Sequence, residues 1–199
     1  MKKRILFNKF DEMKYISHLD TMRFIERLFK ISKIPLIYTQ GFNPRPKLSF
    51  GYPASLGIET YAEPMDFGIE IELSNKEILK RLNEYSPRGF EVTKVMDRGQ
   101  GHTLVKDYNV MVYEIEILDQ ELLIKFKELL LNKEIIHIKN KKGKIKKRDM
   151  KSKIKKVSYE ENKILIYLEE VSPKRFFEIL ETEQNYKIKR IGYDKIEEV

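Results

Sequence analysis

The order of helix-forming and strand-forming segments restricts the fold of this chain more than any other feature. Residues 17–32 and 74–85 each begin with serine, a favoured N-cap residue, and an acidic residue follows three positions later near the positive end of the helix dipole. Four strand-like segments accompany these two helices, at residues 2–10, 36–38, 65–73 and 90–96. The resulting order, βαββαβ, is that of a ferredoxin-like unit, which places both helices on one face of a four-stranded antiparallel sheet.

The helix predicted at residues 17–32 has two distinct faces. Apolar residues at helical spacing predict a buried stripe, formed by Leu19, Met22, Ile25 and Phe29. Cationic residues form a second face alongside it, made of Arg23, Arg27 and Lys30. Because Pro35 cannot continue a helix, we expect this one to end near Ser32.

The second half of the chain repeats this order of elements. Strands are expected at residues 110–118, 134–139, 163–169 and 186–193, and helices at residues 119–131 and 172–181. We therefore predict an α+β protein made of two tandem ferredoxin-like units with antiparallel sheets. The expected domains are residues 1–98 and 108–199, and residues 99–107, which contain two glycines, are expected to link them.

The positive charge of the chain is concentrated in one segment. Residues 139–156 contain eleven Lys or Arg and one Asp, a local charge of +10 in a chain whose total is +8, so the remainder sums to −2. We expect a long basic β-hairpin at residues 139–159, with one strand continuing through residues 144–154 and the return at residues 155–159. The candidate nucleic-acid-binding residues are Lys141, Lys142, Lys144, Lys146, Lys147, Arg148, Lys151, Lys153 and Lys155.

A segment of this charge suits a polyanion, because each neutralised phosphate releases counterions and long-range attraction steers association. A solvated hairpin without any ligand is an equally open interpretation at this point. A membrane surface is a weaker alternative, because the flanking residues do not form an amphipathic helix with aromatic anchors.

Composition narrows the class of protein further. No apolar run approaches the roughly 18 to 20 residues that a membrane span needs, and the basic N-terminus lacks the apolar stretch of a secretory signal, so we expect a cytoplasmic protein with no membrane partner. The absence of cysteine excludes disulfides, thiolate zinc sites and cysteine-ligated iron–sulfur clusters within this chain. With only three histidines, no metal site is expected either.

Residues 39–53, TQGFNPRPKLSFGYP, combine three prolines, two glycines, three aromatic rings and two cations. Rings that stack on bases, amides that read base edges and cations that hold phosphates are the groups that recognise single-stranded nucleic acid. Aromatic residues and arginine are also enriched at protein docking surfaces, so that alternative stays open. We predict a binding site where this stretch meets the first helix, formed by His18, Asp20, Arg23, Arg27, Gln40, Phe42, Asn43, Arg45 and Lys47.

Residues 10–72 resemble the radical SAM-linked proteins, a bacterial family of unknown function. The resemblance is carried by SHLD at residues 17–20, PLIYTQGFNP at residues 35–44, the P-x-x-x-G of residues 53–57 and the pair Ala62-Glu63. It implies a radical SAM protein as partner. The iron–sulfur cluster and S-adenosylmethionine would belong to that partner, because this chain has no cysteine. The family favours histidine where this chain has Arg45, so no role that needs an imidazole is expected there.

Ser17, His18 and Asp20 include the residue types of a nucleophilic triad, but adjacent residues at a helix start point in different directions. Helix capping is therefore the expected role of Ser17 and Asp20. A fold-level similarity to the tandem ferredoxin-like CRISPR repeat-processing endonucleases, some of which use a histidine near the first helix, offers His18 as a general base for RNA cleavage. Those enzymes normally carry a glycine-rich loop near the C-terminus, where this chain has the single Gly192.

These observations lead us to expect a non-catalytic RNA-binding accessory protein that acts with a radical SAM partner in the modification or processing of tRNA or rRNA. In this interpretation residues 39–53 form the specific site, and the basic hairpin supplies affinity without sequence preference. Two alternatives stay open, a metal-independent RNA-processing endonuclease that uses His18 and a protein-only adaptor of a radical SAM enzyme.

Overall fold

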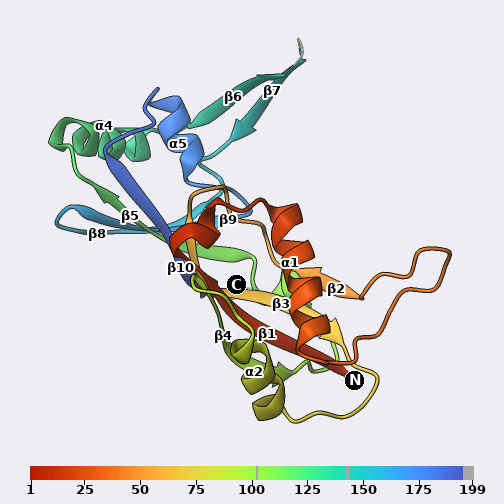
Figure 1. The fold of residues 1–199 in the computed structure, drawn as a ribbon. Helices are drawn as coiled ribbons and strands as arrows, with labels where there is room; N and C mark the ends of the chain where they lie inside the picture. The colour runs from red at the N-terminus through yellow and green to blue at the C-terminus, as the bar shows by residue number, and fades with distance from the viewer. Residues whose placement is uncertain (102, 142–143, 195–199) are drawn as a thin grey trace. The chain divides into compact units, whose positions relative to one another are not determined.

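The computed structural model describes residues 1–101, 103–141 and 144–194, and the chain forms two compact units, Met1–Asn109 and Val110–Val199 (Figure 1). Both units are mixed α/β structures in which the paired strands run antiparallel. The elements of the first unit are β1 (Lys2–Lys9), η1 (Asp11–Tyr15), α1 (His18–Ile31), β2 (Leu48–Phe50), β3 (Glu59–Gly68), α2 (Asn75–Glu84), β4 (Phe90–Asp97) and α3 (Leu104–Asp107).

The sheet of the first unit has the order β4-β1-β3-β2. Phe67 of β3 lies opposite Lys3 of β1 on one side and opposite Leu48 of β2 on the other, which places β3 between them. Helices α1 and α2 pack on one face of this sheet, since Ile25 and Leu82 join Phe67 in a single buried core. The opposite face of the sheet carries charged residues instead, and it is described with the candidate site.

The predicted helix caps are confirmed. The Ser17 hydroxyl accepts a hydrogen bond from the backbone N–H of Asp20 at 3.2 Å and donates one to the Asp20 carboxylate at 2.7 Å. Ser74 likewise accepts from the N–H of Glu77 at 3.1 Å. The buried stripe of α1 differs from the prediction, however, because Leu19 is 63% exposed and the buried residues are Thr21, Ile25, Leu28 and Phe29.

The second strand of the first unit is not where the sequence places it. Residues 36–38 form only isolated bridges, Leu36 with Ile69 and Tyr38 with Pro46, whereas β2 lies within residues 39–53. The segment touches only the end of β3, where the N–H of Ile37 donates to the carbonyl of Gly68 at 2.9 Å, and on its other side the N–H of Lys47 donates to the carbonyl of Ile37 at 2.8 Å. Residues 65–67 of β3 pair with β2 instead, so residues 36–38 do not form a strand. Strand β3 also begins earlier than predicted, at Glu59.

The second unit contains β5 (Val110–Ile117), α4 (Gln120–Leu131), β6 (Ile136–Lys141), β7 (Lys144–Asp149), β8 (Ile154–Glu160), β9 (Lys163–Glu169), α5 (Lys174–Ile179) and β10 (Tyr186–Asp194). Its main sheet has the order β10-β5-β9-β8, and β6 and β7 form a separate two-stranded ribbon. The Phe126 ring of α4 packs against the rings of Phe176 and Phe177 of α5, with centroids 6.0 and 4.9 Å apart. Asp119 caps α4 as the sequence predicts, by accepting from the N–H of Leu122 at 2.7 Å.

The basic hairpin is shorter than predicted and has a different return strand. Its strands are β6 and β7, paired from Ile136↔Asp149 to Lys141↔Lys144, and residues 142 and 143 lie outside the described residues. The carboxylate of Asp149 accepts from the N–H groups of Lys151 and Ser152 at 2.8 and 3.4 Å, so a turn follows β7 directly. Strand β8, which was expected to complete the hairpin, pairs with β9 in the main sheet instead.

The segment predicted as a linker is folded into the first unit. Residues 104–107 form α3, which Thr103 caps by accepting from the N–H of Lys106 at 3.2 Å. Asp107 then forms an ion pair with Arg4 of β1. The boundary between the two units therefore falls at Asn109, after this segment.

Within the part of the chain that the structure describes, no helix is long and apolar enough to cross a membrane. The same residues contain no group of three or more His, Cys, Asp and Glu side chains that could hold a metal ion.

Candidate functional site

Strand pairing sorts the side chains of the β6–β7 ribbon onto two different faces. Residues that lie opposite each other in an antiparallel pair share a face, and faces alternate along each strand. The pairs His137↔Arg148 and Lys139↔Lys146 therefore lie on one face, which we call the cationic face. The opposite face carries the pairs Ile136↔Asp149, Ile138↔Lys147 and Asn140↔Ile145.

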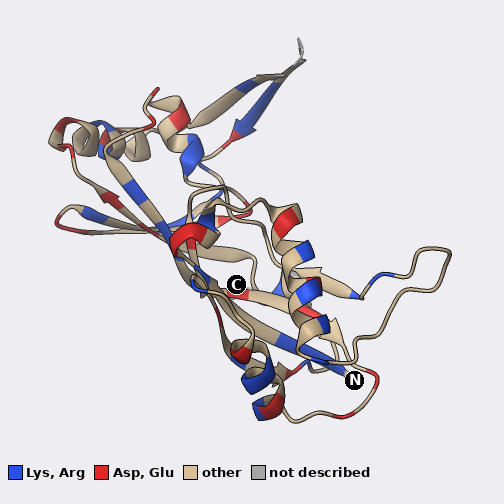
Figure 2. Ribbon diagram, in the orientation of Figure 1, with Lys and Arg blue, Asp and Glu red and all other residues tan. Residues whose placement is uncertain are grey.

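The base of the cationic face is fixed to α5. His137 is buried, and its Nε2 lies 2.5 Å from Oε2 of Glu178. Arg148, opposite His137, and the pair Lys139 and Lys146 farther along the ribbon are exposed, and none of the three forms an ion pair with another described residue. Figure 2 shows Lys and Arg along β6 and β7, with an acidic residue only at the end of β7. The ribbon thus presents cations whose charge is not neutralised by neighbouring carboxylates.

Several of the other predicted cations of this region lie outside the cationic face. Lys153 and Lys155 lie 3.2 and 3.0 Å from Oε2 of Glu169, and Lys151 donates to the carbonyl of Leu130 at 2.6 Å. Lys141 and Lys144 lie opposite each other in the strand register at the end of the ribbon, at positions that continue the cationic face, and Lys142 lies outside the described residues. Lys147 is exposed on the opposite face of the ribbon, beside Ile138.

The pairing of Lys153 and Lys155 with Glu169 has an electrostatic consequence. Hydrogen bonding by Lys155 lowers the pKa of the Glu169 carboxyl below its ordinary value, and Lys153 adds to this effect although partial burial opposes it. Since one carboxylate serves both lysines, part of their charge is compensated within the fold.

The loop at residues 39–47 forms a narrow hairpin of its own. The N–H of Thr39 donates to the carbonyl of Arg45 at 2.8 Å, and the N–H of Arg45 donates back to the Thr39 hydroxyl at 3.0 Å. At the tip, the side chain of Phe42 is fully exposed. The polar residues around it are exposed as well, namely Gln40, Asn43, Arg45 and Lys47.

Helix α1 holds the other predicted binding residues. The Asp20 carboxylate accepts a hydrogen bond from the capping hydroxyl of Ser17 and pairs with Arg23 at 3.3 Å, and Arg27 is exposed. The ring of His18 meets the ring of Phe50 edge-on, with centroids 5.7 Å apart. Figure 1 shows the loop at residues 39–47 extending beyond β2, away from α1. The structure therefore brings His18 to the end of residues 39–53 and leaves the tip of that stretch separate.

His18 borders a small cavity that sequence reasoning did not foresee. The cavity has a volume of about 20 Å³, room for one water molecule, and it is lined by Phe7, Lys9, His18, Thr21, Phe50, Gly51, Pro53, Ala54 and Glu63. Lys9, Thr21 and Glu63 are buried polar residues. His18, Pro53 and Glu63 belong to three of the motifs that carry the resemblance, so the structure gathers separate parts of that signature at one point.

A bulge in β3 accompanies this cavity. The register of β1 with β3 shifts between Phe7↔Glu63 and Lys9↔Thr60, and Ala62 takes the left-handed φ of 58° that L-residues rarely adopt. Asn8 stabilises the bulge, because its Oδ1 accepts from the N–H of Ala62 at 3.0 Å. In the sequence, only the motif Ala62-Glu63 pointed to this bulge. Neither spacing nor composition indicated that Lys9 would line the cavity.

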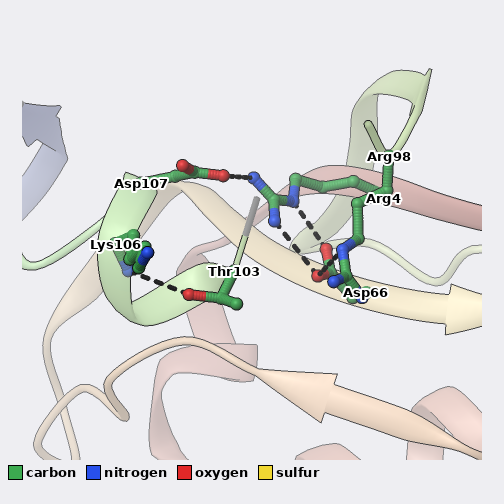
Figure 3. A network of polar contacts seen from close by, with 6 residues as sticks. All are labelled: Arg4, Asp66, Arg98, Thr103, Lys106 and Asp107. Carbon is green, nitrogen blue, oxygen red and sulfur yellow. Dashed lines mark hydrogen bonds and ion pairs between the residues drawn. The ribbon is translucent and has the colours of Figure 1, made fainter. Parts of the chain in front are cut away.

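The other face of the first sheet contains a buried network of ion pairs. Arg4 donates from Nε and Nη2 to the two carboxylate oxygens of Asp66 at 2.5 and 3.0 Å, and from Nη1 to Asp107 (Figure 3). Arg98 lies 3.5 Å from Asp66. Burial by itself would lower the pKa of Arg4, but the hydrogen bonds with Asp66 and Asp107 outweigh it and raise that pKa. Two arginines and two aspartates thus compensate each other at this point.

A comparison with models of protein families gives a match that covers most of the chain. Residues 2–187 match the model of a family described as "Uncharacterized protein conserved in bacteria (DUF2344)". The chain belongs to the DUF2344 family. A search of curated proteins gives no match to this DUF2344 chain. The family description names neither an activity nor a partner, so function has to be argued from the site itself.

Proposed function

We propose that this DUF2344 protein binds RNA through the cationic face of the β6–β7 ribbon. The observation that carries the proposal is the register Lys139↔Lys146 and His137↔Arg148, which gathers exposed cations on one face. A two-stranded ribbon of this kind can lie along a phosphate backbone without reading individual bases. The exposed Phe42 ring at the tip of residues 39–47 is suited to stack on an unpaired base.

The test is the dependence of RNA binding on salt and on the charge of this face. A fluorescently labelled tRNA is titrated with the full-length protein at several salt concentrations. We expect the logarithm of the affinity to fall linearly with the logarithm of the salt concentration, with a smaller slope for the triple variant Lys139→Gln, Lys146→Gln, Arg148→Gln.

The matched control is the double variant Lys153→Gln, Lys155→Gln. Both of these lysines are already paired with Glu169, so their neutralisation should change the affinity and the slope less than the triple variant does. An RNA affinity that changes neither with the salt concentration nor with the triple substitution would refute the proposal.

We further propose that each unit is a ferredoxin-like fold and that the protein acts in the cytoplasm beside a radical SAM partner. Support for the fold comes from the strand orders β4-β1-β3-β2 and β10-β5-β9-β8. In each unit the sheet contains the fourth, first, third and second strand along the chain, in that order, if the β6–β7 ribbon is counted as an insertion before β8. Support for the partner is the resemblance of residues 10–72. Since the chain has no cysteine, the iron–sulfur cluster would lie in the partner.

One observation favours a second candidate function, RNA cleavage with His18 as general base. His18 lies at the edge of a cavity whose wall also contains the buried residues Lys9 and Glu63, a combination of titratable groups found in acid–base catalysis. Incubation of labelled RNA with the protein in the presence of a chelator tests this candidate. Cleavage that His18→Ala abolishes would support it, and intact RNA after prolonged incubation would refute it.

A further inference from the structure

A second, larger depression lies in the first unit, between residues 37–49 and the neighbouring ends of β1 and β3. Its volume is about 570 Å³, within the range of about 300 to 1,000 Å³ that small-molecule sites occupy. The residues that line it come from the hairpin at residues 37–47, from β2 and from the buried ion-pair network. We call it the hairpin groove.

The hairpin groove has an excess of positive charge. Lys2, Lys47 and Arg98 line it, and Asp66 is the acidic residue among its lining residues. Asp66 is already engaged by two of the three guanidinium nitrogens of Arg4 and lies 3.5 Å from Arg98, so these charges compensate each other within the network. The excess therefore comes from Lys2 and Lys47. Lys2 and Lys47 are exposed, and among the described residues no carboxylate is recorded within ion-pair distance of either. The groove therefore favours an anion.

One wall of the groove is apolar and already in place. Ile37, Pro46 and Leu48 line it, and hydrogen bonds between backbone groups at residues 37–39 and 45–47 hold this wall in position. Thr39 and Ser49 add hydroxyl groups. On the other side, the Arg4–Asp66 ion pair fixes the floor. A ligand that combines a flat apolar part with an anionic group would satisfy both surfaces without any rearrangement of the groove.

We propose that the hairpin groove binds a nucleoside monophosphate. Its phosphate lies against Lys2 and Lys47 with Arg98 nearby, and its base lies against Pro46 and Leu48. Lysine is a point-charge partner for phosphate, and the apolar side chains of Pro46 and Leu48 offer van der Waals contact to a base. The groove lies in the first unit and the β6–β7 ribbon in the second, so this site goes beyond the RNA-binding function proposed above.

Isothermal titration of the full-length protein tests this proposal. The probes are the four common ribonucleoside monophosphates, with adenosine as the probe for the ring alone and inorganic phosphate as the probe for the charge alone. We expect at least one nucleotide to bind about tenfold or more tightly than either partial probe, because charged hydrogen bonds and apolar contact both contribute. Lys2→Gln and Lys47→Gln should each weaken binding about three- to tenfold.

Lys94→Gln is the matched control, since Lys94 is an exposed lysine of β4 that does not line the groove, and it should leave the affinity within about twofold. The ribbon variant Lys139→Gln, Lys146→Gln, Arg148→Gln should bind the nucleotide as the wild type does. Nucleotide binding in the groove can therefore be tested even if the ribbon proves not to bind RNA. Equal affinity for phosphate and nucleotide, equal affinity for adenosine and nucleotide, or no saturable binding at all would each overturn the proposal.

The same nucleotide unit could arrive free or as the end of an RNA strand. Competition by a short single-stranded RNA with a 5′-phosphate, and not by the same RNA with a 5′-hydroxyl, would assign the site to an RNA end. A failure of both RNAs to displace the bound nucleotide would assign it to the free nucleotide.

Discussion

Arg4 of β1 and Asp66 of β3 lie directly opposite each other on neighbouring strands, and their side chains form a buried two-point ion pair. Both side chains are less than a tenth exposed, and Asp107 holds the remaining guanidinium nitrogen of Arg4. These contacts join β1, β3 and α3, so the network holds α3 to the face of the first sheet opposite α1 and α2.

Removal of one partner of this pair should destabilise the protein strongly. Arg4→Met leaves the charge of Asp66 buried with Arg98 as its remaining cation, and breaking a buried ion pair costs about 3 to 5 kcal/mol. The double variant Arg4→Met, Asp66→Leu should lose less than the sum of the two single variants, because neither Arg4 nor Asp66 is then left buried without the other. Asp107 and Arg98 still lose one partner each. Urea unfolding of all four proteins measures the coupling, and strictly additive losses would contradict it.

Lys146 and Lys147 are neighbours in the sequence but lie on opposite faces of the ribbon, so they should differ in their effect on RNA binding. Lys146→Gln removes a cation that shares a face with Lys139 and Arg148, and the salt slope should fall by about 1. Lys147→Gln removes a cation beside Ile138 and should change the slope less. Titrations of labelled tRNA at several salt concentrations measure both slopes, and equal changes would mean that the strand register does not select the RNA-binding face.

Gly51→Ala should destabilise the first unit. A Cβ at this position would lie 2.9 Å from Cγ and 3.2 Å from Cδ of Pro64, whose ring cannot move aside like a flexible side chain. Overpacking of this kind costs about 1 to 3 kcal/mol. Urea unfolding gives the loss, and Ser49→Ala in the neighbouring strand, an exposed position, serves as the control with an expected change within about 0.5 kcal/mol. If Gly51→Ala is as stable as the control, the backbone at Gly51 can move away from Pro64 without a cost in stability.

The stability of the second unit should depend on pH through Glu169. Its pKa is lowered from the ordinary value of 4.5 mainly by Lys155, so the folded state favours the ionised carboxylate. The resulting stabilisation is present above pH 4.5 and is lost as the pH falls through the lower pKa of the folded state.

The expected size of this effect is about 0.5 to 1 kcal/mol, since Glu169 is partly exposed. Denaturation at a series of pH values measures it as the difference between the wild type and Glu169→Gln. That difference should shrink as the medium is acidified from neutral pH, and a constant difference across the series would contradict the assignment to Glu169.

Much of the local structure could be predicted from the sequence. Ser17, Ser74 and Asp119 mark helix starts because each cap is a contact between residues three positions apart. The location of the positive charge is likewise a property of the sequence alone. The exposure of Leu19 was not predictable in the same way, because the side of α1 that meets the sheet depends on where the strands lie.

Contacts between residues far apart in the sequence determine which side chains come together at the candidate sites. Residues 36–38 have the character of a strand, but hydrogen bonds with residues 45–47 and the pairing of β2 with β3 determine which segment enters the sheet. The cavity at His18 depends on Lys9 and Glu63, which the register of β1 with β3 brings beneath α1. Long-range pairing of this kind leaves no fixed spacing in the sequence, so only the folded chain shows it.

The sequence by itself determined the order of elements, the helix starts and the presence of a strongly basic segment, because propensity, capping and charge act over a few residues. The tertiary structure decided which lysines share a face, which are paired with Glu169, and which residues surround His18 and the hairpin groove. The physical reason is that strand register places every second side chain on the same face. A shift of a single residue in the strand register would move the side chains of the cationic face of the β6–β7 ribbon to the opposite face, which carries Ile136, Ile138 and Ile145.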